Sequence, residues 1–179
     1  QKDGKDVRFE KAKTHFFWFL QYWMGQALWV SLTACAAIIA ILSPEEDTLP
    51  VLAMLGMALW LTGFTIESIS DYQKRVFRKE NNPSKSFIQT GLWARSRHPN
   101  YFGEITLWTG IAIIALNTLA GIEYITLISP VFVYILLTRM SGVNLLERIA
   151  DERYGELEEY QRYKKNTPVL IPKLSKDKN

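Results

Sequence analysis

The sequence predicts an all-α protein, a multi-pass bundle of about four transmembrane helices with a cytoplasmic amphipathic helix near its C-terminus. Hydrophobic residues make up 48% of the 179 residues, and they gather into four long blocks with the charged residues between them. A spanning helix needs about 20 mostly apolar residues to cross a hydrocarbon core of about 30 Å. The alternative is a soluble protein with buried hairpins, which would have to hide four such blocks in a single domain of residues 1–179.

The four apolar blocks are the predicted spans. They lie near residues 16–42, 50–69, 105–122 and 124–140, and the last two are short and joined by a tight turn. The second block is predicted to continue as a helix beyond the membrane until Asn81-Asn82-Pro83, because the residue before a proline disfavours helical backbone. Pro99 suits the first position of the third helix.

Charge predicts how the spans are oriented. The loop after the first span (43–48) and the turn containing Glu123 are acidic, whereas nearly all Lys and Arg lie in 1–15, 70–98 and 141–179. By the positive-inside rule these basic segments and both chain ends face the cytoplasm, in a bacterial inner membrane or an endoplasmic reticulum-type membrane. The net charge of +3 then reflects contact with anionic membrane lipids. We therefore expect no nucleic-acid partner.

Cysteine and histidine usage predicts no metal site. The single cysteine, Cys35, cannot form an internal disulfide, and it falls in the middle of the first span. The two histidines, His15 and His98, are far apart in sequence, and no Cys/His cluster has the spacing of zinc ligands.

A dense polar stretch precedes the third span. The N-terminus of a helix carries free N–H groups and favours anions. Glu104 lies about one turn into this helix. A charged residue costs up to about 2.5–3.5 kcal/mol at the bilayer centre and less near its edge, so charged residues in a span are functional candidates. The alternative is a polar cap in which the glutamate pairs with an arginine. The candidates in this stretch are Arg95, Arg97, Asn100, Tyr101 and Glu104.

Two further segments carry charge at helical spacing. Asp71, Lys74, Arg75 and Arg78 share one face of the continuing second helix, and an arginine fork suits phosphate oxygens. A solvated face touching lipid head groups is the alternative. The segment 144–163 is predicted to be one amphipathic helix, which either lies in the interface or closes a pocket over the cytoplasmic mouth of the spans.

Arg97-His98-Pro99-Asn100-Tyr101-Phe102-Gly103-Glu104, followed by a tryptophan-containing span, resembles the signature of the steroid 5α-reductase C-terminal superfamily. That superfamily includes sterol C14 reductases and the isoprenylcysteine and phospholipid methyltransferases. The tail from Glu147 through Arg153-Tyr154-Gly155 to Ile171-Pro172 resembles the end of the same proteins. As a whole the chain is most similar to a membrane-protein family related to the 5α-reductases.

The resemblance favours a reductase. The segment from Ser70 to Arg78 is similar to one in which Asp and the second Arg hold the cofactor. Asn100 and Glu104 match an Asn-x-x-x-Glu pattern whose Asn contacts the nicotinamide, and Arg148 stands where the methyltransferases carry a carboxylate. The departures are Lys85 at a reductase tyrosine position and Glu152 at a histidine position. The N-terminal spans of the 5α-reductases, which supply the Glu and Tyr that polarise the ketone, are expected to be absent from this chain.

The resemblance thus implies an enzyme that uses NADPH to reduce a conjugated C=C bond of a lipid- or steroid-like substrate, which enters laterally between spans. The alternatives are a lipid or isoprenylcysteine methyltransferase that uses S-adenosylmethionine, and a non-catalytic membrane subunit. Association with other membrane subunits is also considered. The expected catalytic residues are Tyr101 and Glu104. The expected cofactor-binding residues are Asp71, Arg75, Arg78, Arg95, Arg97, His98, Asn100, Glu147, Arg148 and Tyr154.

Overall fold

A computed structural model describes residues 13–43, 50–82, 86–140 and 142–173, and within these ranges the chain is helical with no strand. The all-α prediction is confirmed. Residues 1–12 of the basic N-terminal segment, the acidic loop 44–48, Pro83 and Lys85 lie outside the described residues. The elements are α2 (Phe16–Leu42), α3 (Pro50–Glu80), η2 (Gly91–Ala94), α4 (Pro99–Ala115), η3 (Gly121–Leu127), α5 (Ile128–Ile135), η4 (Leu136–Met140), α6 (Val143–Tyr154) and α7 (Glu158–Asn166).

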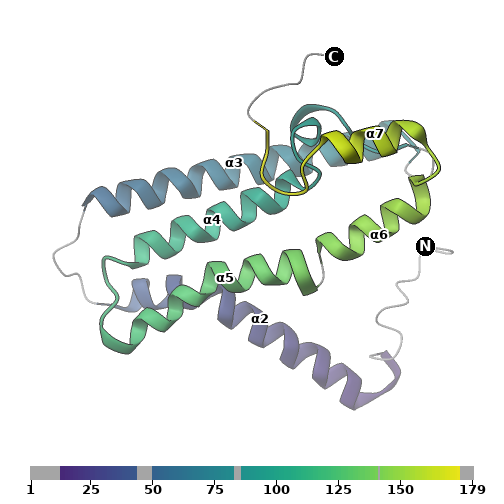
Figure 1. Ribbon diagram of the computed structural model, residues 1–179. Helices are drawn as coiled ribbons and strands as arrows, with labels where there is room; N and C mark the ends of the chain where they lie inside the picture. The colour runs from purple at the N-terminus through teal and green to yellow at the C-terminus, as the bar shows by residue number, and fades with distance from the viewer. Residues whose placement is uncertain (1–12, 44–49, 83–85, 141, 174–179) are drawn as a thin grey trace.

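The helices α3 and α4 form a closely packed antiparallel pair (Figure 1). Glycines face one another along their seam. A methyl group built on Gly56 would lie 2.7 Å from the Gly110 carbonyl oxygen, and one on Gly63 would lie 2.6 Å from the Gly103 carbonyl oxygen. Small residues allow two backbones to approach this closely inside a membrane, where packing drives helix association. The seam fixes the register of α3 against α4.

Three helical segments are long and apolar enough to cross a membrane: 16–42, 51–80 and 121–154. The chain is therefore a multi-pass membrane protein. The first segment has the predicted bounds, and α3 continues to Glu80 as expected. The helix α4 has 17 residues, about 26 Å at 1.5 Å per residue, and is not among the three. A fourth span remains a prediction.

The helix α2 meets the bundle through its C-terminal half and diverges from it toward its N-terminus (Figure 1). Ala36 packs with Ala115 and Leu119 in a small buried cluster. The Ser129 hydroxyl donates a hydrogen bond to the Thr33 carbonyl. The large apolar side chains of the N-terminal half are exposed, as expected for a surface that faces lipid.

The prediction of a single amphipathic helix over 144–163 is wrong. The helix α6 ends at Tyr154, and α7 begins at Glu158 after a short turn. The Gly155 N–H donates to the Asp151 carbonyl at 2.9 Å, and a Cβ on this glycine would lie 2.4 Å from the same oxygen. The turn allows α7 to lie over the ends of α3 and α4 (Figure 1).

The loop between α3 and α4 is fastened on both sides. Gly91 has a φ of +63°, which favours glycine, and the N–H of Leu92 donates to Oε1 of Gln73 at 3.0 Å. On the other side, the chain after α7 runs along residues 95–98 without helix. The N–H groups of Arg97 and His98 donate to the carbonyls of residues 168 and 169, at 2.9 and 3.0 Å.

Candidate functional site

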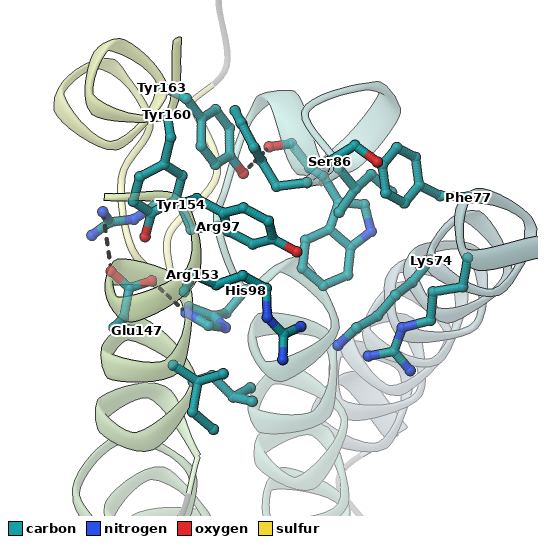
Figure 2. Close-up of a pocket in the computed structure, with 17 residues that line it drawn as sticks. Lys74, Phe77, Ser86, Arg97, His98, Glu147, Arg153, Tyr154, Tyr160 and Tyr163 are labelled. Carbon is teal, nitrogen blue, oxygen red and sulfur yellow. Dashed lines mark hydrogen bonds and ion pairs between the residues drawn. The ribbon is translucent and has the colours of Figure 1, made fainter. Parts of the chain in front are cut away.

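A pocket of about 220 Å³ lies where α3, the loop 86–98, α6 and α7 meet (Figure 2). Segments far apart in sequence build it, because the fastened loop faces α3 on one side and the α6–α7 turn on the other. Its polar and aromatic lining comprises Lys74, Phe77, Arg78, Ser86, Phe87, Trp93, Arg97, His98, Glu147, Arg153, Tyr154, Tyr160 and Tyr163.

Three arginines and one lysine face this pocket, against one carboxylate. Lys74 and Arg78 come from α3, Arg97 from the loop and Arg153 from α6, and the carboxylate is Glu147. The Lys74 ammonium lies 5.0 Å from the ring centroid of Trp93, and the Arg153 guanidinium lies 5.9 Å from that of Tyr154. Such a surplus of positive charge favours an anionic ligand.

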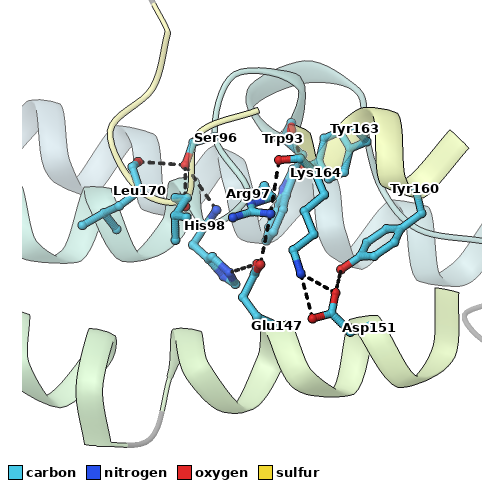
Figure 3. Close-up of polar contacts among 11 residues, drawn as sticks. Trp93, Ser96, Arg97, His98, Glu147, Asp151, Tyr160, Tyr163, Lys164 and Leu170 are labelled. Atoms are coloured by element: carbon cyan, nitrogen blue, oxygen red, sulfur yellow. Dashed lines mark hydrogen bonds and ion pairs between the residues drawn. The ribbon is translucent and has the colours of Figure 1, made fainter. Parts of the chain in front are cut away.

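Glu147 ties the loop to α6 (Figure 3). Its Oε1 lies 2.9 Å from Nε2 of His98, and its Oε2 lies 3.1 Å from Nη1 of Arg97. The Glu147 side chain is 19% exposed, and the Arg97 and His98 side chains are 11% and 7% exposed. One carboxylate thus holds two cationic or dipolar groups in fixed positions, so its own charge is largely compensated.

A second polar network joins α6 to α7 (Figure 3). The Lys164 ammonium lies 2.5 and 2.7 Å from the two Asp151 oxygens, and the Tyr160 hydroxyl donates to Oδ1 of Asp151 at 3.0 Å. The Tyr163 hydroxyl donates to the Trp93 carbonyl at 2.7 Å. Burial raises the pKa of both tyrosines, and the Asp151 acceptor raises that of Tyr160 further. Both hydroxyls therefore remain donors at neutral pH.

Aromatic rings form a continuous wall of the pocket. The ring centroid of Phe87 lies 5.6 Å from that of Tyr154, 5.2 Å from that of Tyr160 and 5.4 Å from that of Tyr163. Flat π surfaces beside cations are suited to stacking a heteroaromatic ring or a base whose phosphate is held nearby.

The first turn of α4 contains Asn100, whose side chain has only one of its two polar atoms hydrogen-bonded among the described residues. Nδ2 of Asn100 donates to Oδ1 of Asp71 at 3.1 Å, which joins α4 to α3. Oδ1 of Asn100 is buried and has no hydrogen-bond partner among the described residues, and the same holds for Nε of Arg97. Buried polar atoms are nearly always satisfied, so these two atoms are candidates for contact with a ligand.

Tyr101 and Glu104 lie farther along α4. The Tyr101 ring stacks on His98 with a centroid distance of 5.6 Å and an interplanar angle of 11°. Glu104 lies near enough to Glu67 and Asp71 to interact with them electrostatically. The described residues show no ion pair between Glu104 and an arginine, so the simple polar cap considered from the sequence does not account for it.

A groove of about 480 Å³ runs along α3 beside the pocket, lined by Asp71, Lys74, Arg75, Arg78 and Lys79. The pocket and the groove share Lys74 and Arg78. The Arg75 guanidinium lies 5.6 Å from the ring centroid of Tyr72. The charged face of this helix therefore forms a wall of two adjoining cavities.

The structure brings most of the expected site residues together. Arg78, Arg97, His98, Glu147 and Tyr154 line the pocket, Asp71 and Arg75 line the groove, and Asn100, Tyr101 and Glu104 lie at the start of α4. Arg148 does not join them, because its side chain is 72% exposed and lies 3.7 Å from Glu152. Arg95 is also exposed.

Eight of the polar and aromatic lining residues were outside the expected set: Lys74, Phe77, Ser86, Phe87, Trp93, Arg153, Tyr160 and Tyr163. Lys74 had a signal, since it belongs to the charged stripe of α3. Tyr160 and Tyr163 lie in the tail that resembles the family, whereas Phe87 and Trp93 had no signal, because only the fold of the loop brings them to the pocket. Among the described residues no group of three or more His, Cys, Asp or Glu side chains is placed to hold a metal ion.

A family model described as "Protein of unknown function (DUF1295)" matches residues 1–167. The 3-oxo-5-alpha-steroid 4-dehydrogenase 1 of Mus musculus is 31% identical over 121 residues, 68% of this chain and 42% of that protein. That of Rattus norvegicus is 31% identical over 119 residues, 66% of this chain and 40% of that protein. That of Homo sapiens is 27% identical over 121 residues, 68% of this chain and 41% of that protein.

The chain spans about two fifths of the length of the curated relatives it matches. No solved structure matches it. The family model, however, covers nearly the whole chain, and the three relatives named above are proteins of one kind. The chain therefore belongs to this family of membrane proteins, the steroid 5α-reductase C-terminal-like family.

Proposed function

We propose that this chain is a membrane oxidoreductase that uses NADPH to reduce a C=C bond conjugated to a carbonyl in a lipid- or steroid-like substrate. The observation that carries the proposal is the pocket in which four cations face one compensated carboxylate. The relatives support it, since their name denotes an oxidoreductase that acts on a 3-oxo steroid.

The residues present fit this cofactor. Phosphates carry several negative charges and require cations, which Lys74, Arg78 and Arg97 supply. The aromatic wall offers a stacking surface. The buried Oδ1 of Asn100, which has no partner among the described residues, can accept a hydrogen bond from the amide N–H of the nicotinamide. An extended dinucleotide is larger than the pocket alone, and the adjoining groove supplies the additional space.

When bound, NADPH would supply the hydride that the β-carbon of the substrate gains. We assign Tyr101 and Glu104 to the substrate side of the reaction. The Tyr101 hydroxyl would donate a hydrogen bond to the substrate carbonyl, where negative charge develops. Glu104 would hold the proton that adds to the α-carbon. The hydride and the proton together account for the two hydrogens gained across the double bond.

The surroundings of the site support a lipid-like substrate. Apolar side chains on α2 and α3 are widely exposed, so lipid covers them and a lipid-like substrate can reach the site from the bilayer. The charged end of α3 carries Lys74, Arg75, Arg78 and Lys79, which suits the cytoplasmic face. We therefore place the pocket and both chain ends on the cytoplasmic side.

A second candidate is methyl transfer from S-adenosylmethionine to a lipid or an isoprenylcysteine. The aromatic wall favours it, because a sulfonium ion is attracted to the faces of aromatic rings. The cations disfavour it, because that cofactor has a positive sulfur and no phosphate. A third candidate, a non-catalytic membrane subunit, predicts that neither cofactor binds.

The test is turnover by the purified chain in lipid nanodiscs. The chain would be incubated with NADPH and a steroid enone, and the product would be analysed by mass spectrometry. We expect a product that has gained two hydrogens, one of them from the labelled nicotinamide position of deuterated NADPH, and a large loss of rate for Arg78→Ala. A product that gains no hydrogen from NADPH, or a rate of reduction that Arg78→Ala leaves unchanged, would contradict the proposal.

A further inference from the structure

Lys74 occupies the place where the pocket and the groove meet. It and Arg78 are the two residues common to the linings of both cavities. In Figure 2 the Lys74 side chain extends from α3 toward the pocket. A ligand that reaches from one cavity to the other therefore passes these two cations.

The Lys74 side chain is held in place by the loop. Its ammonium lies 5.0 Å from the ring centroid of Trp93, which is only 5% exposed. The Trp93 Nε1–H donates to the carbonyl of Ser70, a fully buried residue one turn before Lys74 on the same helix, at 3.0 Å. A cation–π contact engages one side of the ammonium, so N–H donors on its other side remain available to an anion.

Lys74 and Arg78 also carry charge that the described residues leave uncompensated. Neither forms an ion pair with a carboxylate in the described ranges, whereas Arg97 is paired with Glu147. The two cations lie near enough to repel each other, and this repulsion on Lys74 exceeds the attraction from Asp71. Asp71 already accepts a hydrogen bond from Asn100. Adjacent like charges on one helix cost folding free energy, and a ligand with two negative charges would offset that cost.

We infer that Lys74 and Arg78 form a subsite for a phosphate monoester, and that Lys74 is the residue that selects NADPH over NADH. This inference rests on the proposed function. A phosphate monoester carries about 1.5–2 negative charges at neutral pH, and the 2′-phosphate is the group that NADH lacks. The arginine fork can bind two of its oxygens while the lysine supplies a point charge to the third.

The test measures dissociation constants of NADPH and NADH by calorimetry on the full chain in nanodiscs of neutral lipid. We expect Lys74→Gln to weaken NADPH binding about tenfold or more and to leave NADH binding nearly unchanged. Lys74→Arg should retain most of the preference. Lys165→Gln, which removes an exposed charge from α7 outside both cavities, should change neither constant. Equal weakening of both cofactors by Lys74→Gln would overturn the inference and leave the proposed function standing.

A fragment separates this subsite from the rest of the cofactor. Adenosine 2′,5′-bisphosphate carries the phosphate monoester but no nicotinamide, and its binding should change the fluorescence of Trp93, the ring beneath Lys74. The change should be absent in Lys74→Gln and in Trp93→Phe. If the wild type binds neither dinucleotide but binds this fragment through Lys74, the proposed function fails and the subsite survives.

A lipid head group is the other source of a phosphate monoester. The NADPH titration would therefore be repeated in nanodiscs that contain phosphatidic acid. Unchanged NADPH affinity supports the nucleotide subsite. Competition by phosphatidic acid that disappears in Lys74→Gln would assign the two cations to a lipid and overturn the inference.

Discussion

Gly63 and Gly103 face each other across α3 and α4 so closely that a methyl group on either would lie 2.6–2.7 Å from the carbonyl oxygen of the other. A methyl group on Gly103 would also lie 2.6 Å from the backbone nitrogen of Glu67. This close approach is what places the charged end of α3 against the first turns of α4, where Asn100 bonds to Asp71. The glycine seam therefore sets the geometry of the candidate site.

Gly103→Ala should destabilise the protein by about 1–3 kcal/mol, because the added methyl group overpacks a helix interface that has no space for it. The measurement is thermal unfolding in detergent. The matched control is Gly25→Ala in α2, where a Cβ would have nothing within 4 Å. That control should be neutral or slightly stabilising. Equal melting temperatures for the two variants would show that the seam is looser than described.

Glu147→Ala should lower stability by about 2–3 kcal/mol, because it leaves the partly buried Arg97 without its carboxylate and removes the acceptor of His98. Chemical unfolding in detergent measures this. The control is Glu152→Ala, since Glu152 is 70% exposed and pairs with Arg148 at 3.7 Å. Its loss should cost no more than about 0.5 kcal/mol. A cost for Glu147→Ala as small as that of the control would contradict the bracing role.

Tyr163→Phe should cost about 1 kcal/mol at neutral pH, since it removes the hydrogen bond to the Trp93 carbonyl. It should also change the alkaline pH dependence of stability. Burial raises the pKa of Tyr163, so the folded state keeps the phenol proton more tightly than the unfolded chain does.

The resulting stability is present below the unfolded tyrosine pKa of about 10, and it is lost as the pH rises above that value toward the higher folded pKa. We therefore expect the wild type to lose stability above about pH 10 more steeply than Tyr163→Phe. Melting temperatures from neutral to alkaline pH would measure the difference. Parallel curves for the two proteins would mean that this phenol does not keep its proton through burial.

Asn100→Asp should weaken NADPH binding about tenfold or more, since it places a carboxylate next to Asp71 and replaces an amide that both donates and accepts. The exposed Asn166→Asp in α7 adds the same charge away from the site and should have little effect. Calorimetric titration of both variants with NADPH tests this. A weakening shared equally by both would indicate general repulsion of the anionic cofactor.

The sequence predicts the helices better than it predicts their contacts. Strong local signals fixed the bounds of α2 and the start of α4 at Pro99. The break at Gly155 was missed because the charge pattern of 144–163 continues across the turn, and one glycine inside an amphipathic pattern is tolerated in many helices. The glycine seam was missed because its members are seven residues apart on each helix and matter only once α3 and α4 are paired.

The candidate site shows the same division. Motif residues such as Asn100 and Arg78 could be selected from the sequence, whereas adjacent residues of a helix could not be told apart. Glu147 and Arg148 were both expected to bind the cofactor, yet successive residues point about 100° apart around a helix. Glu147 consequently faces the pocket and Arg148 faces outward. Side-chain direction depends on how α6 lies against the loop, which no local signal encodes.

The most direct measurement is calorimetric titration of the purified chain with NADPH and with S-adenosylmethionine, repeated on Arg78→Ala and on the exposed Arg148→Ala. The account predicts that NADPH binds and S-adenosylmethionine does not. It also predicts that Arg78→Ala weakens NADPH about 10- to 100-fold, the loss of about 1.5–3 kcal/mol expected for a charge-assisted hydrogen bond, while Arg148→Ala changes it by no more than about threefold. Binding of S-adenosylmethionine that is indifferent to Arg78 would contradict the account, and so would NADPH binding that depends equally on both arginines.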